Sequence, residues 1–132
     1  MTTSTISKVA AIGAAVAALS VGGVLTAGPA SASGGVCTVG DHCSGNVTFT
    51  SKNEIFYIHD YNRDGHAVYG LLEAKFSDGW HVIKTDINTR GYDAAPLRYN
   101  LSIKEGRAVR YQVCLSEHTR LFHCSSWYHD RA

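Results

Sequence analysis

Oxygen-bearing side chains occupy every second position in one short stretch of the chain. Asp60, Asn62 and Asp64 alternate there, and Gly65 follows directly. The same residue types stand at positions 1, 3, 5 and 6 of an EF-hand loop, where oxygens surround Ca²⁺ and glycine permits a bend. Position 12 of such a loop must be a bidentate glutamate, whereas this chain has Leu71. A β-turn is therefore favoured over a weak or partial calcium site, because Asp and Asn bond their own backbone.

Acid–base and phosphate-binding residue types are present but scattered. A secreted ribonuclease needs a glutamate base, a histidine acid and arginines that hold phosphate. The candidates for these roles are Glu73, His81, Arg98 and Arg110. A group of histidines near the C-terminus could converge on a metal or serve as a base: His118, His123 and His129. No G-x-S-x-G, H-E-x-x-H or P-loop motif occurs. We therefore expect no enzymatic activity and no cofactor, with a small hydrolase or nuclease as the remote alternative.

The cysteines indicate disulfide bonds. All of them follow residue 32: Cys37, Cys43, Cys114 and Cys124. In an oxidising compartment an even count predicts that all are paired. Several pairings are possible, and closeness in the sequence favours Cys37–Cys43 and Cys114–Cys124. A zinc site is disfavoured because neither pair has the tight C-x2-C type of spacing.

The first 32 residues are typical of a secretory signal peptide. Lys8 is the only charged residue, an apolar Ala-rich run extends from residue 9 to about residue 28, and Ala30-Ser31-Ala32 is a small-residue cleavage site. A membrane anchor is disfavoured because glycines interrupt the run and no charged cluster follows it. We therefore expect a secreted, extracellular protein that has no membrane association after cleavage.

The charge balance excludes some partners. The first 32 residues hold one of the 12 Lys and Arg residues and none of the 11 acidic residues. Residues 33–132 therefore carry a formal charge of zero with neutral histidines. Proteins that bind nucleic acid or anionic membranes usually have a basic excess, so neither is an expected partner.

Short alternating runs separated by turn residues predict an all-β domain. Arg107 to Tyr128 has the pattern of a hairpin whose arms are joined by the second disulfide. Its first arm would bury one face, which consists of Val109, Tyr111, Val113 and Leu115. Residues 66–76 predict a long strand, and Asp78-Gly79 predicts the hairpin that follows it. Phe76 would lie on the buried face of that strand.

These elements together predict the domain organisation. We expect a single antiparallel, immunoglobulin-like β-sandwich of about seven strands, tied by disulfides, over residues 46–132. Residues 33–45 are rich in glycine and poor in apolar side chains, so they predict an irregular arm closed by Cys37–Cys43.

Two stretches resemble fibronectin type III domains. Ile103 to Val113 resembles the turn into their penultimate strand, and Ser125-Ser126-Trp127 resembles their last strand. The chain departs from that pattern at Val109 and Glu105, where those domains usually carry Tyr and Pro. The resemblance implies an immunoglobulin-like sandwich.

The layout as a whole also resembles a type of small secreted protein common in actinomycetes. The shared features are the Ala-rich signal, the N-R-D-G-H-A-V stretch from Asn62, and the R-Y-Q-V-C…C-S-S-W ending at Trp127. Some small secreted β-proteins of similar size are adaptors in umbrella-toxin particles, where they link a lectin-like subunit to a toxin-bearing one. This resemblance implies a secreted protein partner and a place in a secreted antibacterial toxin complex.

Aromatic and apolar side chains outside the predicted core are the candidate binding residues. They are Tyr69, Leu71, Trp127 and Tyr128. Aromatic anchors on a neutral surface suit a protein partner, although a second sheet or the N-terminal arm could cover them instead. A non-enzymatic adaptor is therefore the first hypothesis.

A secreted protease inhibitor is the second hypothesis. Its reactive loop would be Asp86 to Pro96, with Arg90 or Arg98 as the residue that enters the protease. Against it, no cysteine flanks this loop to brace it.

Overall fold

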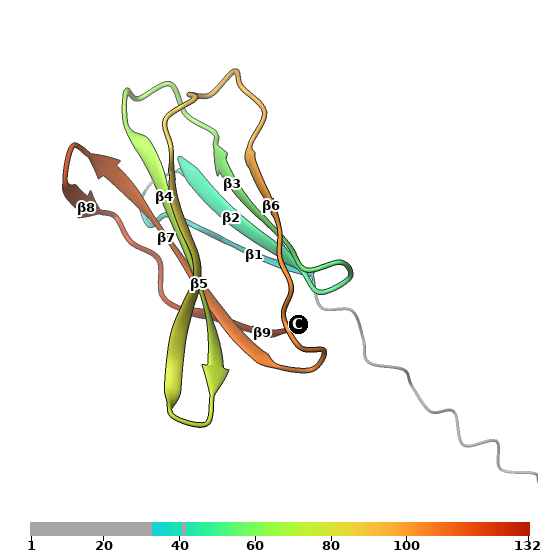
Figure 1. Cartoon of the computed structure of the whole chain (residues 1–132). Coiled ribbons are helices and arrows are strands. Elements are labelled where there is room, and N and C mark those ends of the chain that lie inside the picture. Colours follow the sequence, from blue (N-terminus) through green and yellow to red (C-terminus); the bar gives the residue numbers. More distant parts are fainter. Residues whose placement is uncertain (1–32, 41) are drawn as a thin grey trace, which may run out of the picture.

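The computed structural model describes residues 33–40 and 42–132, and the expected signal peptide lies outside this range (Figure 1). All regular elements in the described range are strands: β1 (Ser33–Cys37), β2 (Gly45–Thr50), β3 (Ile55–Asp60), β4 (Ala67–Phe76), β5 (Gly79–Asn88), β6 (Leu97–Asn100), β7 (Ala108–Glu117), β8 (Arg120–Phe122) and β9 (Tyr128–Arg131). In this part of the chain no helix is long and apolar enough to cross a membrane. The described strands number nine, against the expected seven or so.

The strands form two antiparallel sheets. One sheet has the order β1-β2-β3-β6, and the other has the order β5-β4-β7-β8, with β9 also paired to β7. Figure 1 shows the two sheets as separate layers, with the β4–β5 hairpin projecting at one end. The expected all-β, sandwich-like fold with antiparallel sheets is confirmed.

Both sheets contribute to one core. The buried apolar cluster consists of Val47, Phe49, Phe56, Ile58, Val68, Leu72, Ala74, Ile103, Val109, Tyr111, Val113, Leu115 and Ala132. The predicted buried face of β7 is therefore confirmed. A polar tie also joins the layers, because the fully buried Asn88 of β5 donates from Nδ2 to the Ile58 carbonyl of β3 at 3.0 Å. Such a bond satisfies an amide that would be costly to bury alone.

The N-terminal segment differs from the expected irregular arm, because Ser33–Cys37 forms strand β1 and pairs with β2 over its whole length. The glycine at position 34 has a steric reason. A Cβ on Gly34 would stand 2.6 Å from Cε1 of Tyr128, so only glycine fits beneath that ring. The local disulfide Cys37–Cys43 is present, as expected.

The C-terminal hairpin is held by the second expected disulfide, Cys114–Cys124. Its returning arm is not one continuous strand. It splits into β8 and β9, and the segment between them bonds to β7 differently: the Val113 amide donates to Ser125 Oγ at 3.1 Å and the Ser125 amide to the Val113 carbonyl at 2.8 Å. His123, with φ of 49°, starts this departure from regular pairing.

The β4–β5 hairpin is present where Asp78-Gly79 predicts it. Its register shifts between Leu72 and Glu73, so Ile83 of β5 is an extra residue that turns toward the core. Phe76 was expected on the buried face but is 38% exposed, because it lies at the projecting end of the hairpin.

Candidate functional site

The Asp60–Gly65 segment adopts the turn geometry. Asp60 Oδ1 accepts a 3.2 Å hydrogen bond from the Asn62 amide, and Asp64 Oδ1 accepts a 2.9 Å bond from the His66 amide. Gly65 has φ of 76°, as the bend requires. Partial burial raises the pKa of Asp60 above its usual value. Over residues 33–40 and 42–132, no three His, Cys, Asp or Glu side chains are grouped so that they could hold a metal ion.

The residues considered for a nuclease do not form one site. Glu73 and Arg110 are in contact on neighbouring strands, with Arg110 Nη2 2.6 Å from Glu73 Oε2. His81 instead bonds Asp78 at 2.8 Å, and Arg98 lies on β6 in the other sheet. A general base, a general acid and a phosphate-binding group therefore do not surround a common point.

The C-terminal histidines also lie apart. His129 pairs with Arg110 near the start of β7, whereas His118 follows the end of that strand. A strand rises about 3.3 Å per residue, so these two histidines are separated by roughly 25 Å. His123 follows β8 and contacts the ring of Phe122. The three do not converge.

The strongest candidate site is the surface of β4, β5 and β7 that is turned away from the core, which we call the outer face. Arg110 lies at its centre, with Cζ 4.5 Å from the ring centroid of Trp80 and 4.2 Å from that of Trp127. Its Nε also donates to Glu73 Oε2 at 2.6 Å. Two indole contacts and a carboxylate hold this guanidinium in one position. The resulting stack is rigid, so a partner would not have to order it on binding.

Apolar side chains extend the outer face beyond the stack. Val82 is 56% exposed and Ile87 is 37% exposed, both on β5. Tyr69 and Leu71 of β4 lie beside them, because Tyr69 pairs with Ile87 and partners across an antiparallel pair share one face. These two are half-buried rather than freely exposed.

The structure brings together three of the four predicted binding residues. Tyr69, Leu71 and Trp127 all belong to the outer face. Tyr128 does not, because it stacks on Tyr111 of the opposite, core-facing side with ring centroids 5.1 Å apart. Its own side chain remains 41% exposed over β1. Trp127 and Tyr128 lie on opposite sides of the sheet because they are consecutive residues of an extended chain, whose side chains alternate.

The sequence analysis did not identify Trp80 and Val82 as binding residues, and it considered Arg110 only for phosphate. The alternation of Trp80 and Val82 can be seen in the sequence. The register that places Trp80 opposite Lys75 and Arg110 opposite Glu73 cannot. The pairing of Arg110 with Glu73 joins residues that are distant in sequence, so it cannot be obtained from local spacing.

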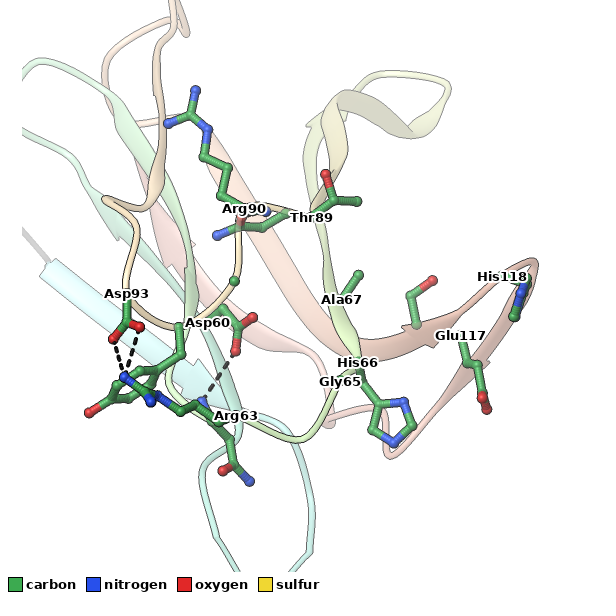
Figure 2. A pocket seen from close by; sticks show the side chains of 15 residues that line it. Asp60, Arg63, Gly65, His66, Ala67, Thr89, Arg90, Asp93, Glu117 and His118 are labelled. Carbon is green, nitrogen blue, oxygen red and sulfur yellow. Dashed lines mark hydrogen bonds and ion pairs between the residues drawn. The ribbon is translucent and has the colours of Figure 1, made fainter.

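A concave surface lies at the end of the sheets opposite the projecting β4–β5 hairpin, where three loops meet around a groove of about 710 Å³. Figure 2 shows its brace, in which Arg63 Nη2 reaches both carboxylate oxygens of Asp93 at 2.8 Å. Glu117 and His118 lie on the far side of the groove from this pair. Its charges are mixed, so the groove does not select one sign of ligand.

The loop proposed for protease inhibition borders this groove. Arg90 is exposed, and its amide donates to Asn88 Oδ1 at 3.0 Å. Gly91 has φ of 83°, and its carbonyl accepts a bond from Ala94 at 3.3 Å. The chain therefore turns directly after Arg90 instead of remaining extended. Arg98 lies outside the loop, on β6.

Compared with known proteins, the chain matches no family model, no curated protein and no solved structure. The site is therefore interpreted from its own geometry.

Polar side chains line β5, the edge strand of the sheet that carries the outer face. Tyr99 of β6 donates to Asp86 Oδ2, and Lys84 Nζ lies 3.8 Å from the same oxygen. The hydrogen bond from Tyr99 lowers the pKa of Asp86, while burial raises the pKa of Tyr99 to about 12. An inward-pointing lysine and a bulge both discourage another strand from pairing with an edge. A partner is therefore expected on the face of this sheet rather than along β5.

Replacement of Tyr99 by Phe should weaken the pH dependence of stability in acid. The bond holds the folded-state pKa of Asp86 below its ordinary value of 3.8, so its contribution is present above that value and is lost as pH falls through the lowered pKa. Urea unfolding at about pH 6 and about pH 3 should show a smaller loss for Tyr99→Phe than for the wild type. Tyr57→Phe is the control, because the Tyr57 hydroxyl bonds Arg98 at 3.4 Å instead of an acid. Identical profiles for wild type and Tyr99→Phe would refute the coupling.

Proposed function

We propose that the chain is a secreted, non-enzymatic protein-binding module that acts as an adaptor within a secreted antibacterial toxin complex. The observation that carries the binding function is the outer face, where the exposed side chains of Val82 and Ile87 extend the surface of the stack formed by Trp80, Arg110 and Trp127. Tryptophan and arginine are the residues most enriched among binding hot spots, and contiguous exposed apolar side chains commonly mark interaction sites.

The fold is proposed to be immunoglobulin-like. Strands β2-β3-β6 face strands β5-β4-β7-β8, and the connections β3–β4, β5–β6 and β6–β7 each cross between the sheets. Crossings of this Greek-key kind are typical of immunoglobulin-like sandwiches, and β1 would then be an addition outside β2.

Secretion is supported by the disulfides. Cys37–Cys43 and Cys114–Cys124 are both formed, and no free cysteine remains in the described chain. Stable disulfides in a small domain are typical of oxidising compartments. The signal-peptide pattern of residues 1–32 leads to the same proposal.

An adaptor needs two separate surfaces. The outer face occupies the β4, β5 and β7 layer, and the braced groove lies at the loop end, around Arg63 and Glu117. The two surfaces involve different residues, so occupation of one does not sterically require that the other be empty.

The function is tested by affinity capture from the culture fluid of the native host. Tagged wild-type protein should recover a stoichiometric complex with larger secreted proteins. Val82→Asp should reduce recovery by at least about tenfold, because a carboxylate would be desolvated in the interface. Val39→Asp is the matched control, since Val39 is 51% exposed and lies on the loop closed by Cys37–Cys43, outside the outer face.

Two results would contradict the adaptor function. Recovery of the wild-type protein alone would exclude a stable complex, and equal recovery with both aspartate variants would exclude the outer face. If the free protein then inhibited a trypsin-like protease, and Arg90→Ala abolished this inhibition, the inhibitor alternative would replace the adaptor.

A further inference from the structure

Basic side chains gather where the β4–β5 hairpin meets the turn between β6 and β7. Lys75, Lys104 and Arg107 line a depression of about 350 Å³ there. Arg131 joins its rim, because its Nη1 donates to the Gly106 carbonyl at 3.0 Å. We call these four residues the basic corner. Glu105 is the only acid among the described residues that line the depression, so the corner has a local positive excess.

Arg107 is held in place without an acidic partner. Its Nη1 donates to the Lys75 carbonyl at 2.8 Å, and its Cζ lies 4.1 Å from the ring centroid of Phe76. Within residues 33–40 and 42–132, Arg63 and Arg110 form ion pairs with carboxylates, whereas Arg107 forms none. A guanidinium has five donors, so an immobilised one with donors to spare is suited to bidentate recognition of a carboxylate.

The basic corner is continuous with the outer face. Lys75 pairs with Trp80, and its Nζ lies 5.4 Å from the centroid of that indole ring. A macromolecule that covers Trp80 would therefore also reach Lys75. Arg107 bonds the Lys75 carbonyl but stacks on Phe76, which points to the other side of the hairpin, so the covering segment would have to continue around the hairpin to reach it. The apolar part of this macromolecule would contact the stack, and the part next to Lys75 would lie beside an excess of positive charge.

We propose that the basic corner binds carboxylates of an acidic segment in the protein that covers the outer face. This inference rests on the proposed function and adds the chemistry of the partner. An acidic peptide fits better than a phosphate polymer because Glu105 lies among the cations, and a peptide can place a neutral residue beside it whereas a phosphate polymer is charged at every unit. Residues 33–132 also carry a formal charge of zero, whereas binders of polyanions usually have a large basic excess.

A labelled peptide provides the direct test. The probe is a short fluorescein-labelled peptide of Glu, Leu and Trp, and its binding to the full protein is measured by fluorescence anisotropy. The double variant Lys75→Glu/Arg107→Glu should bind at least about tenfold more weakly. Affinity for the wild type should also fall as NaCl rises from about 20 mM to about 200 mM, because salt screens exposed charges. Arg90→Glu/Arg98→Glu is the matched control, since both arginines are exposed and lie outside the corner.

Several outcomes would overturn the inference. Equal losses in the two double variants would show a general charge effect, and tighter binding of inorganic polyphosphate than of the peptide would identify a polyanion site instead. Arg107→Gln, which removes the charge but keeps a polar side chain, is the control for misfolding: it should melt as the wild type does and bind the peptide more weakly.

Capture separates the two proposals. If the wild type recovers no complex, the proposed function fails. If the wild type and Lys75→Glu/Arg107→Glu recover the same complex equally well, only the basic corner fails. A weaker recovery with the corner variant, by a difference that narrows as NaCl rises, supports both.

Discussion

Replacement of Cys114 and Cys124 together by Ser is expected to lower the free energy of unfolding by about 2–5 kcal/mol, as removal of a native disulfide from a small domain usually does. Cys114 is 1% exposed within β7, so the substitution also leaves a hydroxyl in a buried site. The bond holds the short strand β8 and the irregular segment after it against β7. Thermal unfolding followed by circular dichroism measures the loss.

The other disulfide is the matched control. Cys37→Ser/Cys43→Ser should cost less, because Cys37 is exposed and only Thr38 to His42 lie inside its loop. The difference in loop length accounts for only about 0.5 kcal/mol of the difference between the two disulfides in their contribution to the free energy of unfolding. The larger share of the expected difference comes from the burial of Cys114. An unchanged melting temperature for the Cys114/Cys124 variant would refute this account of the hairpin.

Truncation of Phe49 to Ala is expected to destabilise the fold by about 3–5 kcal/mol, the range for large aromatic side chains in a core. Phe49 has no exposed surface and lies between the sheets, with its ring centroid 6.2 Å from that of Tyr111. A small domain has a total stability of about 5–15 kcal/mol, so much of it would be lost. Equilibrium urea unfolding gives the magnitude.

Two further variants make this prediction decisive. Phe49→Leu keeps most of the volume and should cost clearly less, so it remains measurable if the alanine variant does not fold. Val82→Ala should change stability by no more than about 0.5 kcal/mol, because Val82 is 56% exposed. If Val82→Ala destabilised as much as Phe49→Ala, the outer face would belong to the structural core and could not be a free binding surface.

Local patterns in the sequence were sufficient for much of the fold. Alternation from Val109 to Leu115 predicted a buried face that the structure contains, and Asp78-Gly79 predicted the β4–β5 hairpin. Closeness in the sequence also predicted both disulfides. In each case the controlling interaction is local, because alternation and turn chemistry act over a few residues.

Long-range geometry accounts for what the sequence did not reveal. Strand β1 was missed because Gly34 is required by the ring of Tyr128, which is more than ninety positions away in the chain. The stack on the outer face depends on the pairing of Glu73 with Arg110, and the shift at Leu72 and Glu73 breaks the alternation of β5. The outward position of Tyr69 and Leu71 could be predicted, because alternation is visible within one strand.

The Cys114–Cys124 bond affects what happens when a protease cleaves the C-terminal hairpin. Arg120 is exposed within the loop that this bond closes, at a position where a trypsin-like enzyme cleaves. A cut there would divide the polypeptide, but the two fragments would stay joined through sulfur and β9 would stay paired with β7. Nicked molecules would retain their shape and would separate only under reducing conditions. A cut in this exposed hairpin would therefore not lead to loss of the fold.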